Sequence, residues 1–122
     1  MSAMSHGHTL KEFREYREKM NEKVLEKGNL VTKRFFNLDT QVYDDGALSR
    51  KTKELLGLVG SLVLRCDDCV TYHIITCVEL KVTDAEFFEA FNVALVVGGS
   101  IAIPHYRHAV EILEECRHKQ TK

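Results

Sequence analysis

Several features that would assign a class of function are scarce in this chain of 122 residues. Lysine and arginine number 17 against 18 aspartates and glutamates, and both signs are scattered, so no charged surface favours nucleic acid or an anionic membrane. The longest apolar runs, at 55–64 and 91–103, fall short of the roughly 18 residues that a membrane-spanning helix needs. Residues 1–8 lack the charged start, apolar run and cleavage site of a secretory signal. We therefore expect a cytoplasmic protein that binds neither nucleic acid nor membrane.

Strand patterns and cofactor motifs are also missing. No segment of five or more residues alternates convincingly between apolar and polar positions, whereas helical periodicity is common. The sequence therefore predicts an all-α protein, and its length predicts one domain over residues 1–122, with residues 1–8 flexible. No flavin, nicotinamide or haem motif is present, so we expect no bound cofactor.

Capping residues and periodicity predict where the helices begin and end. The expected helices are 9–27 with Thr9 as N-cap, a short helix within 29–46, 49–65 capped by Ser49, 66–80, 83–98 with a capping box at Thr83, and a last helix from 100–104 to about 118. The first helix is expected to bury one stripe, made of Leu10, Phe13, Met20, Val24 and Leu25.

Two segments, 55–64 and 91–97, are apolar nearly all round. A monomer of this size would struggle to bury both, so the pattern favours a homo-oligomer. The alternative is a single central hairpin wrapped by the amphipathic helices.

The segment from Cys66 to His73, CDDCVTYH, carries the clearest chemistry. Two thiols at CxxC spacing can close a disulfide, and the start of a helix favours the thiolate over the thiol. His73 follows Cys69 by one helical turn, about 6 Å along the axis, and is the natural base for that thiol. In a reducing compartment such a pair is redox-active or binds a metal.

Glu54 shares the helix face of Leu58 and Leu62, which is expected to be buried. A carboxylate that points inward needs a partner, and it suits proton transfer to an imidazole. Pairing with Arg65 or Lys81 for purely structural reasons would produce the same pattern, and the residues alone leave both interpretations open.

Zinc is the competing interpretation, because Cys66, Cys69, His73 and Cys77 form C-x2-C-x3-H-x3-C. Residues 69 to 77 on one continuous helix span about 12 Å, whereas ligands of one tetrahedral zinc lie within about 4.5 Å of each other, so geometry disfavours a metal site. Cys77 is interpreted as a packing residue, and Cys116 is expected to be inert.

Two histidines near the start of the last predicted helix, His105 and His108, are not assigned to a functional site. His105 and His108 follow Pro104, and a solvated first turn is favoured over a pair of ligands.

The chain resembles the AhpD-like alkylhydroperoxidase group of the carboxymuconolactone decarboxylase superfamily. The resemblance runs from about Ala47 to Leu113 and rests on Lys53-Glu54-Leu55, Cys66-x2-Cys69-x3-His73, the helix start at Thr83, Gly98-Gly99 and the stretch through Pro104. It implies an all-helical fold of five to six helices with a central apolar hairpin, assembled as a trimer or hexamer.

The resemblance also implies roles for four catalytic residues. Cys69 would attack a peroxide, Cys66 would resolve it as a disulfide, and His73 with Glu54 would relay protons; a lipoyl protein or another dithiol would be the external reductant. Better-studied relatives carry a histidine directly before the second cysteine, where this chain has Asp68, an acidic neighbour that makes Cys69 harder to ionise.

The expected function is that of a thiol-dependent antioxidant oxidoreductase, an alkyl hydroperoxide reductase that cycles a CxxC pair between dithiol and disulfide. One alternative is a non-enzymatic redox sensor or oligomeric adaptor. The other is a decarboxylase of the same superfamily, which the intact cysteine pair disfavours, because those enzymes generally lack it.

Overall fold

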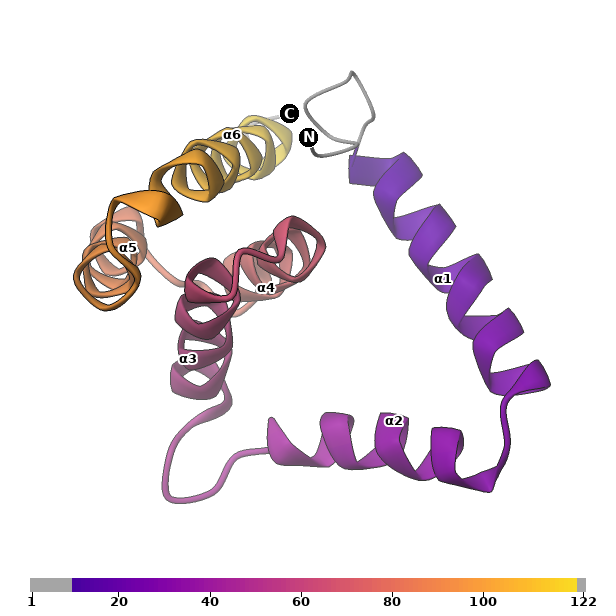
Figure 1. Ribbon diagram of the computed structural model, residues 1–122. Coiled ribbons are helices and arrows are strands. Elements are labelled where there is room, and N and C mark those ends of the chain that lie inside the picture. Colours follow the sequence, from indigo (N-terminus) through magenta and orange to yellow (C-terminus); the bar gives the residue numbers. More distant parts are fainter. Residues whose placement is uncertain (1–9, 121–122) are drawn as a thin grey trace.

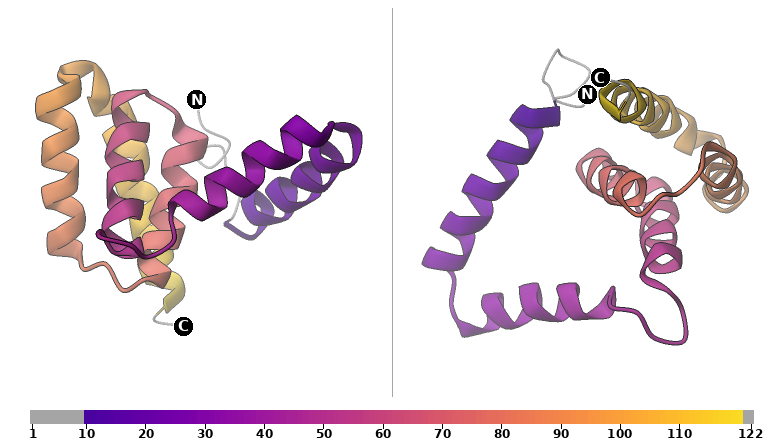
Figure 2. Two further views of the ribbon diagram at one scale, coloured as in Figure 1. Left: turned by 90° about the horizontal axis from the view of Figure 1, so that it is seen from below. Right: turned by 180° about the vertical axis from the view of Figure 1, so that it is seen from behind.

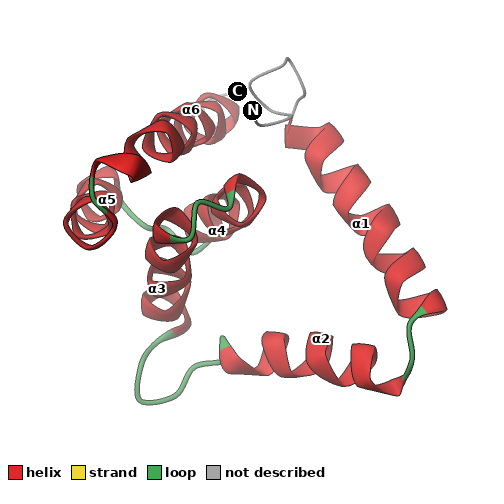
Figure 3. Cartoon of the chain, in the orientation of Figure 1, coloured by secondary structure: helices red, strands yellow, loops and turns green. Residues whose placement is uncertain are grey.

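The structure is a computed structural model that describes residues 10–120, and within that range it contains helices and no strand (Figure 3). The helices are α1 (Leu10–Lys27), α2 (Leu30–Val42), α3 (Arg50–Val63), α4 (Asp67–Glu79), α5 (Asp84–Gly98), the short 3-10 helix η2 (Ser100–Ala102) and α6 (Ile103–Gln120). The all-α prediction is therefore confirmed.

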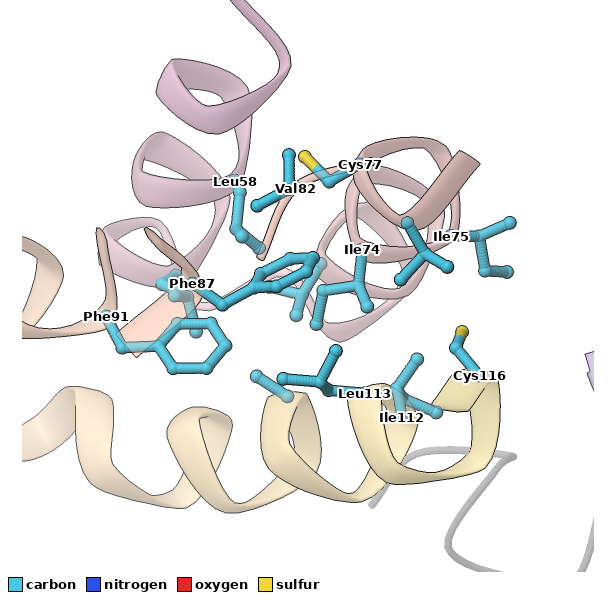
Figure 4. Packing of buried hydrophobic residues seen from close by; sticks show 14 of the residues in the cluster. Leu58, Ile74, Ile75, Cys77, Val82, Phe87, Phe91, Ile112, Leu113 and Cys116 are labelled. Atoms are coloured by element: carbon cyan, nitrogen blue, oxygen red, sulfur yellow. The ribbon is translucent and has the colours of Figure 1, made fainter. Parts of the chain in front are cut away.

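Helices α3 to α6 pack together as a core, and α1 and α2 extend from it as an arm (Figures 1 and 2). The middle of the core is filled by large apolar side chains from all four helices, with Phe87 and Phe91 of α5 next to Leu58 of α3, Ile74 of α4 and Ile112 of α6 (Figure 4). Burial of such side chains supplies the main driving force for folding. Helices α3 and α4 lie at the centre of this packing, so the side chains on their inner faces are enclosed by neighbouring helices.

Local hydrogen bonds fix the helix starts that the sequence predicts. The Ser49 hydroxyl accepts a bond from the Thr52 amide at 3.1 Å, and Thr83 and Glu86 form the expected capping box, with bonds of 3.2 and 2.9 Å between side chain and backbone. The predicted N-cap of α1, Thr9, lies outside the described residues.

The arm departs from the prediction of a buried stripe on the first helix. Of the five stripe residues only Leu10 is buried, and Val24 is exposed. Helix α2 buries none of its residues. The reason is that α1 touches the core mainly through its first half, where Arg14 pairs with Glu79 of α4 at 3.3 Å.

A large apolar surface remains exposed on the single chain. On the arm it consists of Val31, Phe35, Leu38 and Val42, which recur at helical spacing, and on the core Leu64 and Val96 are 79% and 86% exposed. None of the described helices is both long and apolar enough to span a membrane.

Candidate active site

A tight turn between α3 and α4 delivers Cys66 to the start of α4. Helix α3 ends at Val63 with Leu64 as its C-cap, and Arg65 then adopts φ +62°, a left-handed conformation that reverses the chain direction. The Cys66 amide donates back to the Ser61 carbonyl at 3.0 Å, which closes the turn. Cys66 thereby becomes the N-cap of α4, as the sequence predicts.

The two thiols lie on either side of the first turn of α4. The Cys66 sulfur accepts a hydrogen bond from the backbone amide of Cys69 at 3.3 Å, in place of the hydroxyl of an ordinary N-cap residue. Cys66 is half-buried, whereas Cys69 is exposed. The more accessible sulfur is therefore the second of the pair.

The expectation that the helix start makes Cys69 a ready thiolate is wrong. The pKa of Cys69 is raised to about 11, first by partial burial of the thiol, then by its hydrogen bond with Cys66 and the negative charges of ionised Cys66 and of Asp68, against a lowering by Arg17. The amide that would stabilise a thiolate bonds to Cys66 instead. The raising effect of Asp68 on the pKa of Cys69 is in the predicted direction, and Cys69 needs a base to react at neutral pH.

A buried acid and base lie directly beneath this segment. The Glu54 carboxylate of α3 is 1% exposed, the His73 imidazole of α4 is 9% exposed, and Glu54 Oε1 lies 2.8 Å from His73 Nδ1. A carboxylate at that distance accepts the Nδ1 proton, which leaves Nε2 as the nitrogen that can take up another. The partner of Glu54 is therefore His73, and not Arg65 or Lys81.

The imidazole reaches Cys69 only indirectly. Within residues 10–120, His73 makes no direct hydrogen bond to the Cys69 sulfur. Two tyrosine rings border the imidazole, Tyr43 with its centroid at 5.7 Å and Tyr72 at 5.5 Å, and the Arg17 guanidinium lies 3.8 Å above the Tyr72 ring. Sequence reasoning missed these three residues, because Arg17 and Tyr43 come from the arm and no local pattern connects them to α4.

The remaining cysteines are buried among apolar side chains. Burial raises the pKa of Cys77 to about 12 and that of Cys116 to about 11. Cys77 is a packing residue, as its sequence context indicates, and Cys116, expected to be inert, is buried as well. No group of three or more histidine, cysteine, aspartate or glutamate residues in the described part of the chain could hold a metal ion.

The prediction that His105 and His108 lie in a solvated turn is wrong. His105 Nδ1 is 2.7 Å from Asp67 Oδ1, and His108 is buried with Nε2 2.7 Å from the Thr71 hydroxyl. That hydroxyl donates to the Asp67 carbonyl at 2.9 Å, so it accepts from His108. Burial lowers the pKa of His108, and the two histidines fasten α6 to the first turn of α4.

Known proteins share this architecture over most of the chain. The family model described as "Carboxymuconolactone decarboxylase family" matches residues 29–115. A crystal structure from Thermotoga maritima, of a protein of that family with a suggested part in an antioxidative response, is 59% identical with a TM-score of 0.86, and the match covers 89% of this chain and 92% of that one.

More distant proteins agree. A family member from Legionella pneumophila, solved in its apo form, is 29% identical with a TM-score of 0.75, over 85% of this chain and 92% of its own. A Paracoccus denitrificans protein known as "Uncharacterized protein 4 in cox locus" is 28% identical over 72% of this chain and 79% of its own length. The matches confirm the resemblance expected from the sequence, and the chain belongs to the carboxymuconolactone decarboxylase family.

Proposed function

We propose that this protein is a thiol-dependent antioxidant oxidoreductase that reduces alkyl hydroperoxides by cycling Cys66 and Cys69 between dithiol and disulfide. The observation that carries the proposal is the buried Glu54–His73 pair, joined at 2.8 Å one helical turn beyond an exposed cysteine of a CxxC motif. Burying a carboxylate costs free energy unless it has a partner, and Glu54 has its partner in His73 Nδ1, which orients the imidazole and leaves Nε2 for proton transfer.

The residues support a specific order of steps. Cys69, the exposed thiol, gives its proton to the His73 base and attacks the terminal peroxide oxygen, so that an S–O bond forms, the O–O bond breaks and the alcohol leaves with a proton returned from His73. The Cys66 sulfur, held at the N-cap, then attacks the Cys69 sulfenic acid, which releases water and forms the disulfide. An external dithiol restores both thiols.

The test of this function is turnover of peroxide. Purified protein is given cumene hydroperoxide with excess dihydrolipoamide or dithiothreitol, and the peroxide consumed per protein chain is counted for wild type, Cys69→Ser and Cys116→Ser. Wild type and Cys116→Ser should consume many equivalents, whereas Cys69→Ser should match the rate without protein. Equal rates for wild type and Cys69→Ser would refute the assignment.

The same assay separates the second candidate, a redox sensor. A sensor oxidises its cysteine pair once and stops at about one equivalent, whereas an enzyme continues while the dithiol lasts. The base beneath Cys69 favours the enzyme, because repeated turnover needs a group that both removes the thiol proton and returns one to the leaving alcohol.

We also propose that the partners of the chain are an external dithiol or lipoyl reductant in the cytoplasm and further copies of itself, as a trimer or hexamer. The exposed apolar residues of α2 and α5 support self-association, because a lone chain would leave them in water. Light scattering at micromolar concentration should give a multiple of 14.0 kDa, and a 14.0 kDa particle would contradict the assembly.

A further inference from the structure

Gly57 of α3 leaves a space that two functional groups occupy. A Cβ atom at this position would lie 2.7 Å from His73 Cε1, 2.9 Å from His73 Nε2 and 2.7 Å from the Tyr43 hydroxyl oxygen. Such distances are too short for any real Cβ contact. The imidazole of His73 and the phenol of Tyr43 therefore converge on the space that a side chain at position 57 would otherwise occupy.

The Tyr43 hydroxyl approaches His73 on the side of Nε2, the ring nitrogen that Glu54 leaves free. Nδ1 of His73 is occupied by Glu54, so Nε2 is the nitrogen that exchanges a proton, and it lies on the side of the ring that faces Gly57 and the Tyr43 hydroxyl. Because both atoms lie within 2.9 Å of one point, the gap between them is no wider than one bridging water.

Tyr43 is held there by its place in the chain. It is the C-cap of α2, where its amide bonds to the Gln41 and Thr40 carbonyls, and its ring is tilted by 42° against the His73 ring. The arm otherwise contributes little to the core, and α2 buries no residue. The end of α2 nevertheless places a half-buried phenol against the catalytic base.

Burial and the charges around the phenol raise its pKa and so keep it neutral. Burial raises the pKa of Tyr43 first, followed by the negative charges of Glu54 from α3 and Asp39 from α2, and by Tyr72 and Cys69 of α4 once these are ionised. A neutral hydroxyl both donates and accepts a hydrogen bond.

We propose that Tyr43 is a positioning residue of the redox site, whose hydroxyl binds Nε2 of His73 through one water and so sets the path by which the Cys69 thiol gives its proton to that nitrogen. The thiol gives its proton to the water that Tyr43 holds, and this water gives one of its own protons to Nε2. This leaves a thiolate, an imidazolium paired with Glu54 and an unchanged phenol. The reverse transfer returns the proton to the leaving alcohol. The proposal rests on the proposed function, and it accounts for the absence of a direct bond between His73 and Cys69 in the described structure.

The test measures how fast Cys69 reacts, without any peroxide. Reduced protein is alkylated with iodoacetamide over the neutral to alkaline pH range, and modification of Cys69 is followed by peptide mass spectrometry. The variants are Tyr43→Phe, His73→Gln and the double variant, with Tyr16→Phe as the matched control, because Tyr16 is an exposed phenol on the arm. Circular dichroism checks that each variant remains helical.

The relay predicts a specific pattern of rates. Tyr43→Phe should slow alkylation at neutral pH about tenfold, the effect of one lost hydrogen bond, and shift the profile to higher pH, while Tyr16→Phe matches wild type. His73→Gln should slow it at least as much. If the two groups form one path, the double variant is no slower than His73→Gln alone.

Two results would overturn the proposal. One is a Tyr43→Phe profile identical to that of wild type, and the other is a double variant whose slowing is the product of the two single effects, which would mean independent roles. Failure of the peroxide assay would leave this pattern intact, because alkylation needs no turnover, so the two proposals can fail separately.

Discussion

The Glu54–His73 pair offers the sharpest test of the site, because removing only the charge of Glu54 separates its electrostatic role from its packing role. Glu54→Gln keeps the volume of the side chain and an oxygen that can accept the Nδ1 proton at the observed 2.8 Å. What disappears is the negative charge that stabilises the protonated imidazole.

The magnitude follows from the kind of hydrogen bond that is lost. A bond to a charged group contributes about 1.5–3 kcal/mol, and one between neutral groups about 1 kcal/mol, so the imidazolium loses about 1–2 kcal/mol. Since each 1.4 kcal/mol corresponds to a factor of ten, proton transfer to His73 should become about five- to thirtyfold less favourable. Peroxide turnover and alkylation of Cys69 at neutral pH should slow by a similar factor.

A second substitution at the same position gives the contrast. Glu54→Leu removes the acceptor as well and leaves the buried Nδ1–H without a partner, at a cost of about 1–3 kcal/mol in the free energy of unfolding. For a chain of this size each kcal/mol lowers the melting temperature by about 4 °C, so we expect a fall of about 4–12 °C. Glu54→Gln should fall by much less.

The assays are the alkylation rate of Cys69 and thermal unfolding followed by circular dichroism. The reasoning would be refuted by a Glu54→Gln protein that reacts as fast as wild type, because the charge of Glu54 would then have no part in proton transfer. An unchanged melting temperature for Glu54→Leu would show that the hydrogen bond contributes nothing to the fold either.

Three further predictions concern neighbouring residues. Burial lowers the pKa of His108 below 6.5, so just below that pH the unfolded chain binds more protons than the folded chain. The free energy of unfolding from urea titrations should therefore be highest above about pH 6.5 and fall as the pH drops. His108→Gln should flatten this slope, and an unchanged slope would contradict the assignment. Asp68→Asn removes one cause of the raised pKa of Cys69, so alkylation of Cys69 at neutral pH should speed up about two- to threefold. The gain is modest because the Asp68 side chain is exposed and its charge is screened by salt. A gain from the substitution that is equal in low and high salt would count against a charge effect. Gly57→Ala gains about 1 kcal/mol of helix propensity but places a Cβ atom too close to His73 and Tyr43. Alkylation of Cys69 should therefore slow more than tenfold while the protein stays helical. A variant that is alkylated as fast as wild type would show that the close approach of His73 and Tyr43 is not needed.

The sequence determined the features that depend on neighbouring residues. The caps at Ser49 and Thr83 form through hydrogen bonds that span three residues, and helical periodicity places Glu54 on the buried face with Leu58. The position of Cys66 at a helix start also follows from local signals. These interactions are decided within one or two turns, so a single sequence is enough to predict them.

Only the tertiary structure decided which of these residues meet. The partner of Glu54 is 19 residues away, and His105 and His108 are bound to groups of α4 that lie 38 and 37 residues away. Tyr43 reaches the base from another helix, through the space left by Gly57. Such contacts depend on the angles and distances at which whole helices pack, and these are set by the combined fit of many apolar side chains, which no local pattern encodes.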